Sequence, residues 1–345
     1  MKLRHVLSIT SLLAAIVTGP AAAEGLAGAP SPFDKGGVKV ALVSYISSGD
    51  FFEAYQSGVQ AQAKKLGIDL RVFPGKQDAA EQRTQIEQAI NLGVKAIVID
   101  HGLPEALKDV AQKAVEAGVK VVAFDVNLDN PKIPQVEQSD ADMARLVLDQ
   151  AVKEQGKGLK GGVVYVAGFA PLDRRYAVWK EFGKTHGLEE RAVWGVVNDS
   201  VPASVADQTK AVLRAHPEIT AIFTPWDEFA RGVKLAIDEL GVGEKVKIYG
   251  VDISTSDIQA IIEPKSPWVA TAATNASVVG EVSVRAVALL IADQDPGHSV
   301  LVQPRLVTRA ELVENNIKTI EDLAAKIPAF RTSDAATAPW IPQVK

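Results

Sequence analysis

The chain has 345 residues, of which 47% are hydrophobic and 23% charged, and it contains no cysteine. This length is what about two ordinary domains occupy, and the lack of cysteine excludes a disulfide framework and a lipid anchor on cysteine. The formal net charge is −5 and no long run of Lys or Arg occurs, which argues against a nucleic-acid or anionic-membrane partner.

The first 23 residues have the order of a secretory signal peptide. Lys2 and Arg4 precede an apolar run over 6–17, and a Gly-Pro-Ala-Ala-Ala stretch follows at 19–23. The apolar run is shorter than the roughly 20 residues that cross a bilayer. We therefore expect residues 1–23 to be a cleaved signal peptide and the mature protein to be soluble in the periplasm.

From residue 38 onward, apolar runs of strand length alternate with longer segments of helical period, the pattern of βαβ units and parallel sheets. A polar segment with two prolines, 126–142, interrupts this pattern and predicts a crossing between two domains. A helix is expected over 278–291, an apolar stretch follows over 300–307, and the tail beyond Phe330 is expected to be loose. Strands are expected over 38–45, 68–73, 94–100 and 119–125, and then over 161–167, 192–197, 219–224, 246–252 and 268–274.

Carboxylates recur at the ends of these expected strands, where doubly wound sheets bind their ligands. Asp100, Asp125, Asp227 and Asp252 all stand there. Any one of them can cap the next helix. If the two domains face each other, however, Asp125 and Asp252 converge on one cleft, where they accept hydrogen bonds from neutral hydroxyl groups and repel anions.

Aromatic residues occupy two other strand ends. Phe51 and Phe52 follow a polar loop, and helical spacing places Phe52 in the core and Phe51 in the cleft. Trp226 follows a buried strand, so it forms the cleft wall opposite Phe51 or else covers a helix start. Flat aromatic faces beside carboxylates suit a sugar ring or a polyol.

Motifs for catalysis and metal binding are mostly absent. The sequence has no H-E-x-x-H, Walker A or G-x-S-x-G motif, and its histidines lack metal spacing. His101 follows a strand and either lines a pocket or begins a helix. We expect no cofactor and no enzymatic activity; the rival hypothesis is an exported carbohydrate-active enzyme that uses paired aspartates as acid and base.

Several short segments keep the order and spacing that they have in one known family. These are ALV before a polar loop with Phe51-Phe52, Gly118 to Val122 before Phe124-Asp125, Ser139-Asp140, Ala215-His216-Pro217 before Trp226-Asp227-Glu228, Tyr249 to Asp252, and Ala270-Thr271 before Thr274-Asn275. From about residue 38 to 307 the chain resembles the type I periplasmic sugar-binding proteins of ABC importers, closest to the ribose-binding branch.

The resemblance implies an α/β fold of two doubly wound parallel-sheet lobes joined by a three-segment hinge, in a monomer. The lobes would comprise 37–138 with about 275–303, and 139–274 with about 304–330, followed by a loose tail over 331–345. Lobe closure would enclose a sugar or polyol, and a membrane permease would recognise the closed form. The alternative is a sensor of the same fold that presents its ligand to a chemoreceptor or sensor kinase.

Matched position by position, the resemblance also implies a ligand site. Phe51 and Phe52 take the place of ring-stacking aromatics, Asp125 and Asp252 that of the gripping carboxylates, and Thr274 that of a hinge glutamine. Where the ribose-type pattern has arginine or asparagine, this chain has Val126, Val178, Gly49 and Trp226, and Ser200 stands where that pattern has an aromatic residue, which argues against ribose; Arg174 or Arg175 could substitute for a missing arginine. The expected ligand-binding residues are Phe51, Phe52, Asp125, Trp226, Asp252, Thr274, Asn275, Tyr45, His101 and Arg175.

Overall fold

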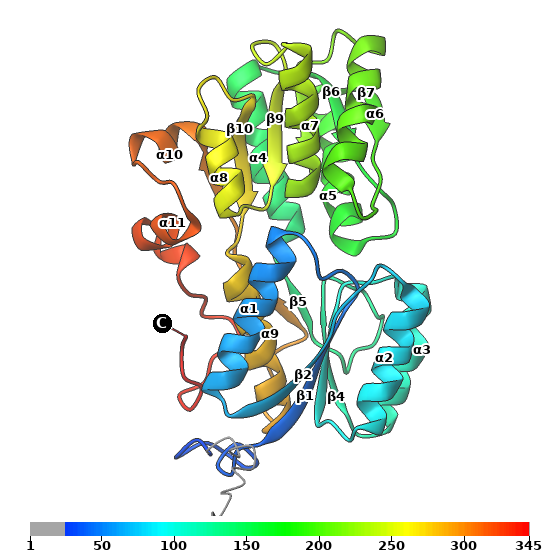
Figure 1. Cartoon of the computed structure of the whole chain (residues 1–345), viewed down its shortest axis with the longest axis vertical. Coiled ribbons are helices and arrows are strands. Elements are labelled where there is room, and N and C mark those ends of the chain that lie inside the picture. The colour runs from blue at the N-terminus through cyan, green and yellow to red at the C-terminus, as the bar shows by residue number, and fades with distance from the viewer. Residues whose placement is uncertain (1–24, 345) are drawn as a thin grey trace, which may run out of the picture.

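A computed structural model describes residues 25–344 of the chain, so the expected signal peptide lies outside the described residues. Two lobes lie one above the other along the long axis, and each contains one six-stranded sheet with helices on both faces (Figure 1). The predicted α/β fold of two doubly wound lobes is confirmed. Within residues 25–344, no helix combines the length and the apolar character needed to cross a membrane.

The sheet of the first lobe is parallel throughout. Helices α1 (Asp50–Lys65) and α9 (Ala276–Ile291) cover one face, and α2 (Ala79–Asn91) and α3 (Pro104–Glu116) cover the other (Figure 1). In their order across the sheet, the strands are β11 (Ser299–Leu301), β5 (Gln135–Glu137), β4 (Lys120–Phe124), β3 (Ala96–Asp100), β1 (Val38–Ser44) and β2 (Ile68–Phe73).

The sheet of the second lobe is parallel except for its edge strand β12, which runs antiparallel to β10. The strands across it are β12 (Arg305–Thr308), β10 (Trp268–Ala273), β9 (Lys247–Val251), β8 (Ala221–Thr224), β6 (Lys160–Val164) and β7 (Glu189–Trp194). Helices α4 (Asp140–Gln155) and α5 (Ala170–His186) pack on one face. The other face carries α6 (Val201–Ala215), α7 (Asp227–Leu240) and α8 (Thr255–Ile262).

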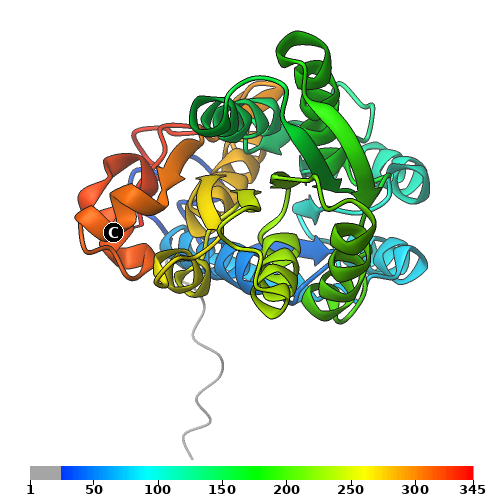
Figure 2. The ribbon, with the colours of Figure 1, turned by 90° about the horizontal axis from the view of Figure 1, so that it is seen from above.

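The last elements of the second lobe are α10 (Arg309–Glu314), α11 (Ile320–Lys326) and a 3-10 turn at Pro328–Phe330. Seen from above, the orange segment that carries α10 and α11 lies to one side of the molecule (Figure 2). The chain passes between the two sheets after β5, after β10 and between β11 and β12. We keep the residue ranges of the two lobes given above as our proposal for the domain boundaries.

The elements differ from their expected positions mainly near the crossings. Strand β5 was not expected, because its three residues lie inside the irregular segment 126–142 and only the neighbouring strands identify it. The stretch 300–307 is divided between β11 and β12, which belong to different sheets. Strand β7 ends at Trp194 and not at Val197, because Gly195 turns away with a φ of 153°.

Side chains cap several of the helices that follow these strands. Asp78 accepts hydrogen bonds from two backbone amides of α2, and Ser254 and Asp257 form a reciprocal capping box at α8. Asn275 accepts a hydrogen bond from the amide of Ser277 and so begins α9. These caps fix where the helices begin and therefore where the loops facing the other lobe end.

Helices α1 and α9 approach each other backbone to backbone, although they are far apart in the sequence. A Cβ added to Gly58 would lie 1.8 Å from the carbonyl oxygen of Ser277, and one added to Gly280 would lie 2.1 Å from that of Tyr55. Only glycine fits at these two positions. The contact holds the middle of α1 against the start of α9, and so fixes the position of the helix that carries Phe51.

The tail beyond Phe330 is not loose, contrary to the expectation. Its Trp340 ring lies 5.1 Å from the Phe33 ring, and Ile341 is buried. Arg285 of α9 is completely buried and donates a hydrogen bond to the carbonyl oxygen of Ser333 in the tail. Helix α9 is apolar on almost every side, so the tail covers the face that the sheet leaves open. It thereby adds a further connection from the second lobe back to the first.

Candidate functional site

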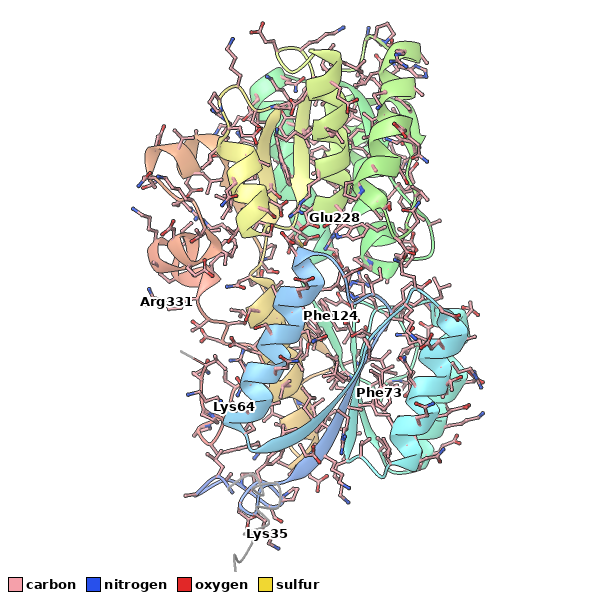
Figure 3. The ribbon with its side chains drawn as sticks, viewed as in Figure 1. Lys35, Lys64, Phe73, Phe124, Glu228 and Arg331 are labelled. Atoms are coloured by element: carbon pink, nitrogen blue, oxygen red, sulfur yellow. The ribbon has the colours of Figure 1, made fainter. Side chains whose placement is uncertain are left out.

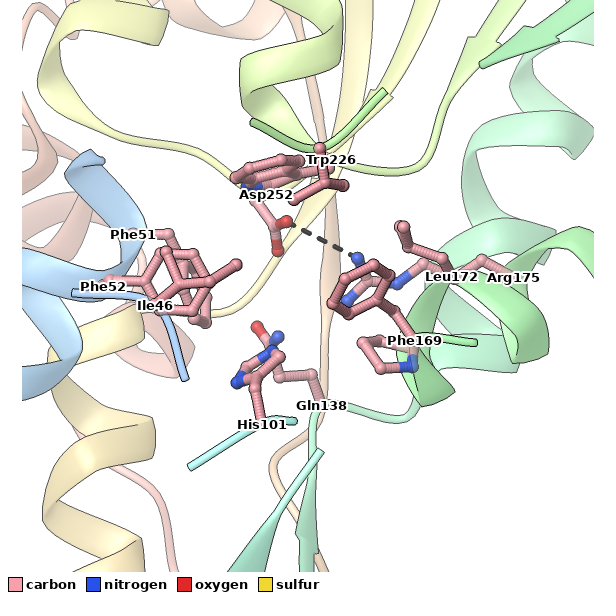
Figure 4. Close-up of a pocket in the computed structure, with 12 residues that line it drawn as sticks. Ile46, Phe51, Phe52, His101, Gln138, Phe169, Leu172, Arg175, Trp226 and Asp252 are labelled. Atoms are coloured by element: carbon pink, nitrogen blue, oxygen red, sulfur yellow. Dashed lines mark ion pairs between the residues drawn. The ribbon is translucent and has the colours of Figure 1, made fainter. Parts of the chain in front are cut away.

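A cavity lies between the two lobes, where the carboxyl ends of the strands of both sheets face each other. Phe124, at the end of β4, and Glu228, at the start of α7, lie on the facing ends of the two lobes (Figure 3). The cavity is lined by Ile46, Phe51, Phe52, His101, Gln138, Phe169, Pro171, Leu172, Arg175, Val197, Trp226 and Asp252 (Figure 4).

Aromatic rings from both lobes form one wall of the cavity. Phe51 and Phe52, in the first turn of α1, lie edge to face with ring centroids 5.4 Å apart. The Phe52 ring also meets Trp226 of the other lobe edge to face at 6.3 Å. Phe52 lies in the core of the first lobe, as expected, and also lines the cavity, whereas Trp226 contacts Phe52 where Phe51 was expected.

Three polar residues that follow strands share an unusual backbone conformation. His101, Asp125 and Asp252 follow β3, β4 and β9, and their φ values are 57°, 51° and 74°. This left-handed region is uncommon for residues other than glycine and is often found at functional sites. The turn directs each side chain out of the sheet and toward the region between the lobes.

Asp252 lines the cavity with a carboxylate that is only partly satisfied by its neighbours. Its Oδ2 lies 3.5 Å from Nη1 of Arg175, whereas its buried Oδ1 has no hydrogen-bond partner in the part of the chain that the structure describes. Burial raises the pKa of Asp252 to about 6, although the charge of Arg175 opposes this shift. A buried, unpaired carboxylate oxygen is unfavourable by itself, so a ligand hydroxyl that donates to it gains a strong hydrogen bond.

His101 is held in place by acidic neighbours. Its Nδ1 lies 2.7 Å from Oδ1 of Asp100, and its Nε2 lies 3.9 Å from Oδ2 of Asp125, too far for a hydrogen bond. Burial lowers the pKa of His101, but the hydrogen bond and charge of Asp100 outweigh burial and leave the pKa above its ordinary value. With Nδ1 engaged by Asp100, Nε2 is available to a ligand in the cavity.

Two arginines at the start of α5 are neutralised by carboxylates. Arg175 places Nε 2.7 Å from Oδ1 of Asp140, and Arg174 places Nη2 2.8 Å from Oδ1 of Asp125. Burial acts to raise the pKa of Asp140, but the two arginines outweigh it and hold that pKa below its ordinary value. Arg175 therefore reaches the cavity with its charge already paired, whereas Arg174 joins the second lobe to Asp125 of the first.

A second ion pair joins the lobes away from these residues. Nη2 of Arg231 in α7 lies 2.6 Å from Oδ2 of Asp50 at the start of α1, and Nε of the same arginine lies 2.7 Å from Oδ1 of Asp257. Gln77 also donates a hydrogen bond of 3.3 Å to Asp199 across the lobes. These contacts hold the lobes together around the cavity.

The structure places part of the expected site in the cavity lining and part behind it. Phe51, Phe52, His101, Arg175, Trp226 and Asp252 line the cavity. Four expected residues lie behind the lining: Tyr45, Asp125, Thr274 and Asn275. Each of them either contacts a lining residue or holds the hinge.

Each residue behind the lining has an identifiable structural partner. Asp125 faces Arg174 and accepts a 3.5 Å hydrogen bond from Gln138, and burial raises its pKa to about 7. Thr274 donates a 2.5 Å hydrogen bond to Oε1 of Gln138. Tyr45 packs against the ring of Phe169, and Asn275 begins α9 as described.

Six lining residues were not among those expected from the sequence. Ile46 lies in the loop after β1, Phe169 precedes α5, and Pro171 and Leu172 lie in the first turn of α5, positions at which the sequence does not show which side chains face inward. Val197 was assigned to a strand, and Gln138 to the domain crossing. The six are Ile46, Gln138, Phe169, Pro171, Leu172 and Val197.

Metal binding finds no support in the region that the structure describes. Across residues 25–344, no group of three or more His, Cys, Asp or Glu side chains is arranged to hold a metal ion. The acidic side chains around the cavity are instead balanced by Arg174 and Arg175. The arrangement is suited to hydrogen bonding and apolar contact with an enclosed organic molecule.

The chain is similar to known proteins over both lobes. A family model described as periplasmic binding protein domain matches residues 40–295, a range that includes every lining residue. A 5-methylthioribose transporter solute binding protein from Thermotoga lettingae, solved in complex with 5-methylthioribose, is 37% identical with a TM-score of 0.86, over 88% of this chain and 97% of that one.

Two further comparisons point in the same direction. A sugar ABC transporter structure from Yersinia enterocolitica is 29% identical with a TM-score of 0.86, over 92% of this chain and 97% of that one. The ribose import binding protein of Bacillus subtilis is 25% identical over 246 residues, which is 68% of this chain and 76% of that protein.

Proposed function

The chain belongs to the periplasmic binding protein domain family of sugar-binding ABC transporter proteins, and from this premise we propose that it captures one neutral sugar or sugar alcohol between its lobes and delivers it to the permease of an ABC importer. The observation that carries the proposal is the unpaired Oδ1 of buried Asp252, which lies in a cavity walled by Phe52 and Trp226. Carboxylates that accept from hydroxyls and aromatic faces that cover a ring are what a sugar needs.

The charge balance of the site supports a neutral ligand. Asp125, Asp140 and Asp252 are buried around Arg174 and Arg175, so within residues 25–344 these carboxylates pair with the two arginines of the site and leave neither free for an anionic group. A phosphate or a ligand carboxylate would have to displace one of these ion pairs. Ligand hydroxyls require no such exchange.

The relatives support the choice of ligand class and role. The Thermotoga lettingae structure contains 5-methylthioribose, and the Bacillus subtilis relative is named for ribose import. In our proposal, the ligand stabilises the closed arrangement through contacts with both lobes, and the permease binds the closed protein at the periplasmic face of the membrane. The protein itself acts as a monomer and carries out no chemical step.

A thermal-shift screen of the purified mature protein against sugars, sugar alcohols, amino acids and purines tests the proposal. A ligand that binds only the folded state raises the melting temperature. We expect sugars or sugar alcohols to do so, and analysis of the mixtures afterwards should recover the sugar unchanged. A shift with amino acids or purines alone would refute the sugar assignment, and the appearance of a reaction product would refute a pure binding role.

A further inference from the structure

The cavity lining changes from polar to apolar across the width of the sheets. Its polar residues Gln138, His101 and Asp252 follow β5, β3 and β9, which lie toward the side of the sheets that carries the chain crossings. Toward the opposite edge, the lining after β1, β6 and β7 is apolar apart from Arg175, whose Nη1 lies 3.5 Å from Oδ2 of Asp252 on the polar side. We call that part of the lining the apolar end; it consists of Ile46, Phe169, Leu172 and Val197.

The apolar end is enclosed by both lobes. Phe169 and Val197 pack against the hydrophobic core of the first lobe as well as that of the second, and Ile46 belongs to the first core. Leu172 is buried in the first turn of α5. A ligand group placed here therefore meets mainly the carbon atoms of these side chains.

The polar groups of the lining cannot serve every hydroxyl of an ordinary sugar. Gln138 is engaged with Asp125 and Thr274, and Arg175 is engaged with carboxylates and with a backbone carbonyl. Among residues 25–344, Oδ1 of Asp252 and Nε2 of His101 are the lining's polar atoms without a hydrogen-bond partner that a ligand hydroxyl would reach. A pentose carries hydroxyls around its whole periphery, and one that faces the apolar end would lose its hydrogen bonds to water without replacement.

We propose, building on the sugar-binding function above, that the site selects a sugar in which one terminal hydroxyl is replaced by an uncharged apolar group, such as hydrogen or an alkylthio group. The ring hydroxyls face Asp252 and His101, and the apolar group lies against Phe169, Leu172 and Val197. Unmodified ribose is a poorer ligand because its terminal hydroxyl is buried without a partner. A phosphorylated sugar is excluded because its charge would be buried against carbon.

Isothermal titration calorimetry with four probes tests this inference: ribose, 5-deoxyribose, 5-methylthioribose and ribose 5-phosphate. We expect 5-deoxyribose and 5-methylthioribose to bind at least about tenfold more tightly than ribose, and ribose 5-phosphate to show no binding. Ribose binding as tightly as the substituted sugars, or any tight binding of the phosphate, overturns the inference and leaves the sugar-binding function in place. Failure of every sugar, including those in the wider screen, overturns both.

A pair of matched variants tests the assignment of the apolar end. Val197→Asn places an amide in the lining, whereas Val196→Asn makes the same change at a half-buried neighbour that packs only on the core of the second lobe. We expect Val197→Asn to reduce the preference for 5-methylthioribose over ribose at least fivefold, and Val196→Asn to leave it unchanged. An equal preference in both overturns the assignment. If Val197→Asn does not fold, Leu172→Gln applies the same test from α5.

Discussion

Replacing Asp252 by asparagine should weaken sugar binding without lowering the stability of the fold. The substitution keeps the size of the side chain and removes its charge. A hydrogen bond to a charged acceptor contributes about 1.5–3 kcal/mol, so its loss weakens sugar binding by roughly ten- to a hundredfold. Because asparagine still offers a carbonyl oxygen, the lower part of that range is expected. Calorimetric titration at pH 7.5 with the tightest sugar from the screen measures the effect.

Without ligand, the Asp252→Asn variant should be at least as stable as the wild-type protein. The pKa of Asp252 in the folded protein, about 6, lies above its unfolded value, so ionising this group destabilises the fold as the pH rises from about 4 to 6. Asparagine removes that penalty, and the melting temperature at pH 7.5 should not fall. Asp227→Asn is the matched control, since Asp227 is equally buried and outside the lining. Affinity within twofold of wild type, or an equal loss in the control, would refute the role given to Asp252.

Three further expectations concern the same cavity and the contacts around it, and a fourth concerns the tail. The affinity for the sugar should fall as the pH drops from 7.5 to 5, because ligand hydroxyls bind the ionised form of Asp252. Below the Asp252 pKa of about 6, the fall should approach tenfold per pH unit. An affinity that does not change with pH would contradict this. Trp226→Ala should weaken binding at least about tenfold with little change in melting temperature, and unchanged affinity would reduce Trp226 to a packing role. Arg231→Ala should weaken binding about two- to fivefold, because it removes the ion pair with Asp50 that joins the lobes, and the loss should shrink at high salt. Unchanged affinity would show that this pair does not contribute to closure. Deleting 331–345 should lower the melting temperature by at least about 4 °C, since the deletion uncovers the outer face of α9; an unshifted transition would show that the tail contributes nothing to the first lobe.

Much of the fold followed from local pattern. The run 68–73 was predicted with the bounds that the strand has, because Ile68, Leu70 and Val72 alternate with polar residues and Gly67 ends the helix before it. The short β5 and the division of 300–307 between two sheets could not be predicted. A strand of three residues has no period of its own, and only pairing with a neighbour defines it.

The sequence by itself determined the α/β alternation and the strand-end positions of Asp252, Phe51 and Trp226, because a residue that follows a parallel strand reaches the ligand edge of the sheet whatever else the chain does. Tertiary structure decided which of those residues face the cavity. Asp125 stands at an equivalent strand end, but Arg174, 49 positions away in the other lobe, occupies it. The inward orientation of Val197 likewise depends on the closure of one lobe on the other, and contacts between distant segments leave no periodic trace in the sequence.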